Sequence, residues 1–137
     1  MVRNKMRKLI TPHLSIAKTA CRCGCGLGSL YPYLIDPYIA FIFETLRIAC
    51  GNNPLVINCG WRCPKHNKKV GGYPNSVHLT GGALDIQKPE WMELTEFHNI
   101  ADLVVGDGGV GRYPNFVHID AGGIIDSLPK RRRWAKL

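Results

Sequence analysis

The chain has 137 residues, a formal net charge of +8, 45% hydrophobic residues and 20% charged residues. This length allows one domain with one modest core, and the composition is typical of a globular protein. No apolar run approaches the roughly 20 residues that span a bilayer, which excludes a transmembrane helix.

The first predicted elements lie in the N-terminal half. Residues 11–21 indicate a turn and a short helix, followed by a loop rich in cysteine and glycine. Residues 36–51 predict a long helix, because Asp36 can cap it, Pro37 suits its first turn and Gly51 follows its end. This helix is apolar nearly all round, as expected for burial against a sheet. A strand is predicted within residues 55–61, and a short polar helix within 63–72.

The second half adds strands and another helix. Residues 81–87 favour a strand, and residues 90–105 favour a helix with one apolar side. Residues 106–123 predict two short strands joined by a Tyr-Pro-Asn turn. Without regular β-α alternation, this order predicts an α+β fold: a small, mostly antiparallel sheet flanked by helices.

Basic residues gather at the two ends of the chain. Residues 1–8 and 130–137 hold nine of the 18 basic residues and none of the ten acidic ones, so the segment between them has a net charge of −1. We therefore expect one domain over residues 1–137, with short basic tails at both ends. The tails are either solvated ends or weak binders of a polyanion, such as nucleic acid, anionic lipid or a cell-wall polymer.

The N-terminus begins basic, as a secretory signal does, but Pro12, His13 and Lys18 interrupt any apolar segment. We therefore predict no cleavable signal and synthesis in a cytosol, which favours reduced thiols. Alternatives are one or two disulfides, or a second metal site; "CRCGCG" lacks the paired C-x-x-C spacing of zinc ribbons. The six cysteines are Cys21, Cys23, Cys25, Cys50, Cys59 and Cys63.

Three residues form a candidate metal site. His78 and Asp85 are seven residues apart around Gly81 and Gly82, which let the chain bend between them. His118 lies on a predicted strand, where Phe116, His118 and Asp120 would face a cleft while Val117 and Ile119 enter the core. Two histidines and a carboxylate suit a catalytic zinc with an open position. The other histidines, His13, His66 and His98, are interpreted as structural, with His98 facing solvent.

The segment "SVHLTGGALD" resembles the S-x-H-x-x-G-x-A-x-D signature of zinc D-alanyl-D-alanine carboxypeptidases. Relatives of that family include D-alanyl-D-alanine dipeptidases and phage L-alanyl-D-glutamate endolysins. "INCGWRCPKHNKKVGG" is similar to the family's S-G-Y-R-C-P-x-H-N stretch, and "FVHIDAG" to its last metal-binding strand. "LITPHLSIAKTACRCGCG" resembles the opening of a small phage and bacterial branch, so the resemblance covers roughly residues 9–123.

The resemblance implies that His78, Asp85 and His118 bind one zinc ion per chain. It also implies that Arg62 and Ser76 contact the substrate or polarise its scissile carbonyl. A guanidinium suits this role because it pairs with a carboxylate or an oxyanion through several donors. Trp61 replaces the family's tyrosine beside this arginine and is expected to keep an aromatic wall.

One departure concerns the general base. Many relatives carry a catalytic Glu or Asp three residues before the last ligand, where this chain has Asn115. An amide cannot accept the proton, so Asp120 is our candidate base. The alternatives are that Asp120 orients a ligating histidine instead, or that activity is weak or absent.

The predicted function is a monomeric zinc metallopeptidase that cleaves peptidoglycan stem peptides, as a D,D-carboxypeptidase or an endopeptidase. Such a protein acts on the bacterial cell wall, and a phage endolysin is one form of it. A non-catalytic zinc-containing binding module is the first alternative, favoured by Asn115. Nucleic-acid binding through the basic tails is the second, although the near-neutral body offers no extended basic groove.

Overall fold

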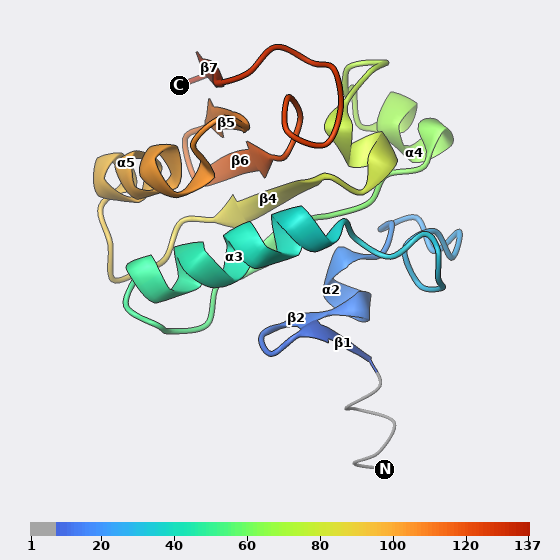
Figure 1. Cartoon of the computed structure of the whole chain (residues 1–137), viewed down its shortest axis with the longest axis horizontal. Coiled ribbons are helices and arrows are strands. Elements are labelled where there is room, and N and C mark those ends of the chain that lie inside the picture. Colours follow the sequence, from blue (N-terminus) through green and yellow to red (C-terminus); the bar gives the residue numbers. More distant parts are fainter. Residues whose placement is uncertain (1–7) are drawn as a thin grey trace.

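The computed structural model describes residues 8–137 and shows a five-stranded sheet with two long helices against one face (Figure 1). Neighbouring strands are antiparallel, except that the last strand pairs in parallel with its neighbour. The α+β prediction is therefore confirmed. In sheet order, the strands are β3 (Ile57–Cys59), β4 (Ala83–Gln87), β6 (Phe116–Asp120), β5 (Gly109–Arg112) and β7 (Arg132–Ala135).

The helix α3 (Pro37–Ala49) begins where the sequence predicts, because the Asp36 side chain accepts a hydrogen bond from the Tyr38 amide at 2.8 Å. One side of α3 packs in the core, including Phe43. The other side is open: Phe41 is 69% exposed and Ile48 is 67% exposed. The helix is therefore buried on one side only, and part of its nearly continuous apolar surface faces outward.

The helix α5 (Leu94–Val105) buries Phe97 and Ala101 against the sheet. His98 is also buried, at 2% exposure, and its Nε2 donates to the carbonyl of Phe116 at 3.1 Å. The prediction that His98 faces solvent was therefore wrong. Burial lowers the pKa of His98, which favours the neutral ring in this structural bond between α5 and β6.

Smaller elements complete the N-terminal half. The strands β1 (Leu9–Thr11) and β2 (Leu14–Ser15) form a hairpin that leads into the short helix α2 (Ile16–Thr19). Glu44 of α3 holds this hairpin by accepting from the hydroxyl of Thr11 at 2.6 Å and pairing with the His13 ring at 2.7 Å.

Two short helices lie between β3 and β4 in the chain: α4 (Pro64–Lys69) and the 3-10 helix η1 (Val77–Thr80). None of the described helices has the length and apolarity needed to cross a membrane.

The C-terminal basic segment is part of the sheet. Arg132–Ala135 form β7, and Arg133 donates to the carbonyls of Gly106 and Gly108 at 2.6 and 2.8 Å. Of the two alternatives for the C-terminal end, a solvated tail does not describe Arg132 and Arg133, because their guanidinium groups bond to carbonyls and carboxylates of the folded chain. The predicted N-terminal tail, residues 1–8, lies outside the described residues except for Lys8.

Candidate metal centre

A row of neighbouring residues crosses the sheet on the face opposite the helices. Strand register pairs Cys59 with Asp85, Asp85 with His118, His118 with Gly111, and Gly111 with Trp134. Residues directly opposite each other on adjacent strands share a face. The row therefore places Asp85 and His118 side by side, although they are 33 residues apart in the chain.

His78 reaches this row from the short helix η1. The Ser76 hydroxyl caps η1 by accepting from the His78 amide at 3.3 Å, and Gly81 ends it with φ +74°. A side chain at Gly81 would collide with Trp61, 2.4 Å from the added Cβ, so glycine is needed in this bend. Trp61 packs in the core instead of forming a wall of the site.

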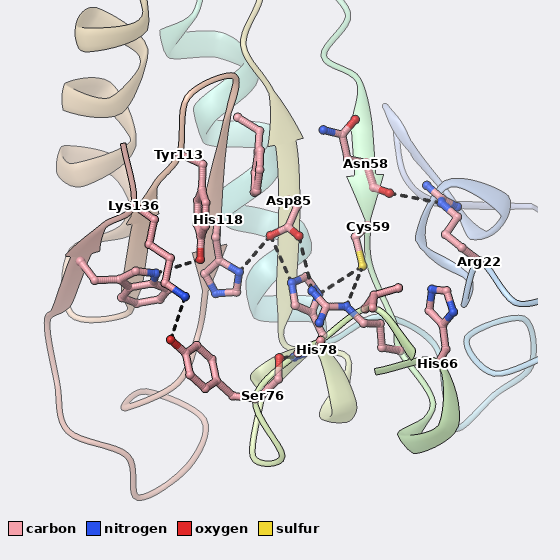
Figure 2. Close-up of a pocket in the computed structure, with 17 residues that line it drawn as sticks. Arg22, Asn58, Cys59, His66, Ser76, His78, Asp85, Tyr113, His118 and Lys136 are labelled. Atoms are coloured by element: carbon pink, nitrogen blue, oxygen red, sulfur yellow. Dashed lines mark hydrogen bonds and ion pairs between the residues drawn. The ribbon is translucent and has the colours of Figure 1, made fainter. Parts of the chain in front are cut away.

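Two of the three predicted ligands, His78 and His118, face one oxygen atom of the third, Asp85 (Figure 2). Asp85 Oδ1 lies 3.1 Å from His78 Nε2 and 2.9 Å from His118 Nδ1. The two imidazole rings meet edge to face, with centroids 5.0 Å apart. We call His78, Asp85 and His118 the His–Asp centre.

The outward-facing nitrogens of both rings are occupied. His78 Nδ1 lies 2.7 Å from the Gly60 carbonyl, and His118 Nε2 lies 2.7 Å from Asp120 Oδ2. Both partners are acceptors, so each ring donates a proton outward; a neutral ring then turns its other lone pair toward Asp85, and a protonated ring donates there as well. When both rings are neutral, three acceptor atoms face one another, and a cation, either a proton or a metal ion, satisfies them. The residues of the His–Asp centre therefore fit a zinc ion.

The charges of the centre agree with this geometry. Burial disfavours the charged imidazole, but the hydrogen bonds and charges of Asp85 and Cys59 outweigh it and raise the pKa of His78 to about 9. Burial likewise opposes ionisation of Asp85, yet His118 and His78 hold its pKa well below its usual range. Asp85 thus attracts positive charge, whether a proton on His78 or a metal ion.

Cys59 offers an alternative ligand, because its sulfur atom lies within 4.8 Å of ligand atoms of His78 and Asp85. However, Cys59 Sγ is 3.7 Å from His78 Nδ1, the nitrogen that bonds to Gly60. His78 turns Nδ1 toward Gly60 and Cys59 and turns Nε2 toward Asp85 Oδ1, so the nitrogen nearest the thiol is not the nitrogen that faces the carboxylate. The set with His118 uses, in both rings, the nitrogen that faces Asp85 Oδ1.

Asp120 lies behind His118, away from Asp85. It is 1% exposed, and it also accepts from the Gly122 amide at 2.9 Å and from the Arg132 guanidinium. Gly109 lies between Asp120 and Arg132 in the sheet register, and a Cβ there would come within 2.5 Å of Asp120 and 2.7 Å of Arg132. The glycine thus lets an arginine on β7 reach a carboxylate on β6.

Gly111 has the same role two register pairs along the sheet. A Cβ at Gly111 would come within 2.5 Å of the Trp134 ring, which lies over this position and approaches His118 with centroids 5.1 Å apart. The Trp134 indole donates to the Tyr113 hydroxyl at 3.1 Å. Arg132 and Trp134 were not among the predicted site residues, because their segment was interpreted as a basic tail. The alternating glycines 109 and 111, unusual inside a strand, were the signal that could have found them.

Arg62 adjoins the centre on its other side. Its guanidinium donates to Asn67 Oδ1 at 2.8 Å and to Cys59 Sγ at 3.2 Å, and it lies 3.5 Å from Asp85 Oδ2. Gly72 permits this packing, because a Cβ there would overlap both Asn67 and the guanidinium. Arg62 therefore faces the His–Asp centre in a fixed orientation.

The His–Asp centre lies in a cleft of about 430 Å³. Three cationic side chains line the cleft, those of Arg22, Arg62 and Lys136, together with Ser76 and His66. Among residues 8–137, Asp85 is the only carboxylate that lines it. Asn115 is exposed in the turn between β5 and β6 and does not line the cleft. The cationic side chains that line the cleft therefore favour an anionic ligand.

We predict that Gly109→Ala weakens the zinc affinity of the His–Asp centre about tenfold, because the new methyl group separates Arg132 from Asp120. The overpacking should also cost about 1–3 kcal/mol of unfolding free energy. Zinc titration and urea denaturation measure the two effects.

Val110→Ala is the control, since Val110 is fully buried in the core. It should lower stability and leave zinc affinity intact. Unchanged zinc affinity in Gly109→Ala would mean that the contact of Arg132 with Asp120 does not influence the metal site.

Two histidines and a carboxylate in an open cleft form a ligand set found in several classes of metal-dependent enzyme, zinc hydrolases and non-haem iron oxygenases among them. Comparison with known families places the chain more closely: residues 12–120 match the model of the family described as Peptidase M15. The chain belongs to this family of zinc peptidases, and the resemblance to zinc D-alanyl-D-alanine carboxypeptidases is confirmed at that level. A search of curated proteins found no match.

Proposed function

We propose that this chain is a zinc metallopeptidase that cleaves peptide bonds in peptidoglycan stem peptides, with His78, Asp85 and His118 as the zinc ligands. The observation that carries this proposal is the convergence of His78 Nε2 and His118 Nδ1 on Asp85 Oδ1, at 3.1 and 2.9 Å. A zinc ion held by these residues would activate a water molecule as nucleophile and polarise the scissile carbonyl.

The cleft supplies the substrate contacts in this proposal. Arg22, Arg62 and Lys136 line it, and they suit a peptide that carries free carboxylates, as stem peptides do. Arg62 is closest to the centre, so it pairs with a substrate carboxylate or with the oxyanion that forms at the scissile carbonyl. Ser76 caps η1 and also lines the cleft, where its hydroxyl is within reach of the same substrate.

The contacts of Asp120 bear on its role. Its two oxygens bond to His118 Nε2, the Gly122 amide and Arg132, so both are engaged behind the histidine ring. These contacts favour a positioning role, in which Asp120 fixes the tautomer and orientation of His118, over the role of general base.

A binding module that keeps zinc without turnover is the second candidate. The observation that favours it is that the described residues place no carboxylate in the cleft besides Asp85. Nucleic-acid binding has less support, because Arg132 and Arg133 contact residues of the domain itself. Action on a bacterial cell wall, as a cellular enzyme or as a phage endolysin, follows from the peptidase proposal.

Digestion of purified muropeptides separates the two candidates. The zinc-loaded chain is incubated with them, and mass spectrometry identifies the products with and without a chelator. Chelator-sensitive cleavage is expected, and the product masses tell which bond is cut and whether the cut is terminal or internal. Intact muropeptides that still bind to the zinc-loaded chain would reject the peptidase and support the binding module.

Arg62→Lys is expected to lower kcat/KM by about 10² or more, because an ammonium cannot reproduce the planar fork beside the centre. The melting temperature should change much less, although the bonds to Asn67 and Cys59 are also affected. Lys65→Arg, a reciprocal change on the exposed side of α4, is the control and should be neutral. Full activity of Arg62→Lys would place Arg62 outside the reaction, and a loss of activity matched by a loss of melting temperature would make it structural.

A further inference from the structure

Four of the six cysteines meet at the start of α4, as a cluster distinct from the His–Asp centre. Three come from the loop that follows α2, and Cys63 is the residue that caps α4. The four sulfur atoms all lie within 4.8 Å of one another. Each is a free thiol. We call Cys21, Cys23, Cys25 and Cys63 the thiol cluster.

The spacing of the sulfur atoms suits a shared metal ion. Cys23 Sγ lies 3.4 Å from Cys21 Sγ and 3.6 Å from Cys63 Sγ. A tetrahedral zinc with Zn–S bonds of about 2.3 Å separates its sulfur ligands by about 3.8 Å. A disulfide needs about 2.05 Å. Four sulfur donors around one point select zinc over the harder cations, which prefer oxygen.

The backbone of the loop holds the thiols in this arrangement. Gly24 and Gly26 have φ values of +77° and +91°, which other residues rarely adopt. The loop closes on itself through bonds from the Gly24 amide to the Cys21 carbonyl at 3.2 Å and from the Cys21 amide to the Leu27 carbonyl at 2.9 Å. The alternating glycines of "CRCGCG" thus turn cysteines two residues apart toward one point.

Backbone amides also point at the sulfur atoms. The Cys63 amide donates to Cys21 Sγ, and the His66 amide donates to Cys63 Sγ, both at 3.4 Å. Such N–H donors stabilise the negative charge that a thiolate carries when it binds a metal. Cys21 is buried at 5% exposure, whereas Cys23 and Cys25 are exposed, so an ion can enter from solvent.

We propose that the thiol cluster binds a second zinc ion, which has a structural role. Each thiol loses its proton to solvent on binding, and the resulting four-thiolate site is closed, without an open position for substrate. The ion joins the loop after α2 to the first turn of α4, next to Arg62 in the cleft. This proposal does not rest on peptidase activity.

Metal analysis of the full chain, purified under reducing conditions without chelator, tests the site. We expect two zinc ions per chain in the wild type and one in the variant that combines Cys23→Ser with Cys25→Ser. The control Cys50→Ala removes a buried cysteine that lies outside the cluster and should keep both ions. The variant that combines His78→Ala with His118→Ala should keep one, held by the thiols.

A second readout covers the case in which the serine variant does not fold. Wild-type chain loaded with cobalt in place of zinc should show thiolate-to-cobalt charge-transfer absorption, which the histidine variant retains. Three results would overturn the proposal: one zinc per chain that is lost in the histidine variant, a disulfide within the cluster by intact mass, or no thiolate-to-cobalt absorption. None of these requires turnover, so failure here is distinct from failure of the proposed peptidase function.

Discussion

His78→Ala and His118→Ala are each expected to remove one equivalent of zinc and to abolish peptide cleavage. Each ring supplies one of the two nitrogen atoms that face Asp85 Oδ1, and a site left with two ligands holds zinc weakly. Metal analysis after gel filtration and the muropeptide digestion measure the two losses. Asp85→Asn should weaken zinc binding less predictably, because an amide oxygen still coordinates, though poorly.

The matched control is His13→Ala. His13 pairs with Glu44 at the N-terminal hairpin and does not line the cleft, so its loss should leave zinc and cleavage unchanged. If both His78→Ala and His118→Ala keep the full zinc content of the wild type, the His–Asp centre is not a metal site.

Asp120→Asn is the second large effect, and it separates the two roles open to this residue. In the positioning role, which its contacts favour, zinc affinity should fall about 10–100-fold and excess zinc should restore cleavage. As the general base, Asp120 would leave zinc binding intact on substitution, and turnover at saturating zinc would fall by about 10²–10⁴. Zinc titration combined with kcat at saturating zinc distinguishes these results.

Asp126→Asn is the control for this substitution. Asp126 accepts from the amides of Gly123 and Leu128 at 2.8 and 3.0 Å in the loop after β6, and it does not contact His118. It should change neither zinc affinity nor turnover. Asp120→Asn with wild-type affinity and turnover would contradict both roles.

Local sequence patterns account for the elements and for the candidate ligands. The Asp36 cap and the Gly51 stop mark the ends of α3, and both depend only on neighbouring residues. His78 and Asp85 lie within one short segment, so their spacing is visible without the fold. His118 follows from strand alternation, which places it on the face opposite Val117 and Ile119.

Contacts between distant segments were decided only by the tertiary structure. Arg132 resembles a solvated tail residue in the sequence, and only the pairing of β7 with β5 brings it over Gly109 to Asp120. Asp120 follows His118 by two residues, a spacing that suggests a general base. In the sheet, however, the His118 ring lies between the two carboxylates, with Asp85 at its Nδ1 and Asp120 at its Nε2.

The same reason explains the cysteines and His98. The sequence determines that three cysteines alternate in one loop, but Cys63 comes 40 residues after Cys23, and no local periodicity links them. His98 shows no local sign of burial, because its partner is a carbonyl 18 residues away on β6. Local propensity and side-chain chemistry are properties of short segments, whereas burial, pairing and shared ligands depend on which segments the core brings together.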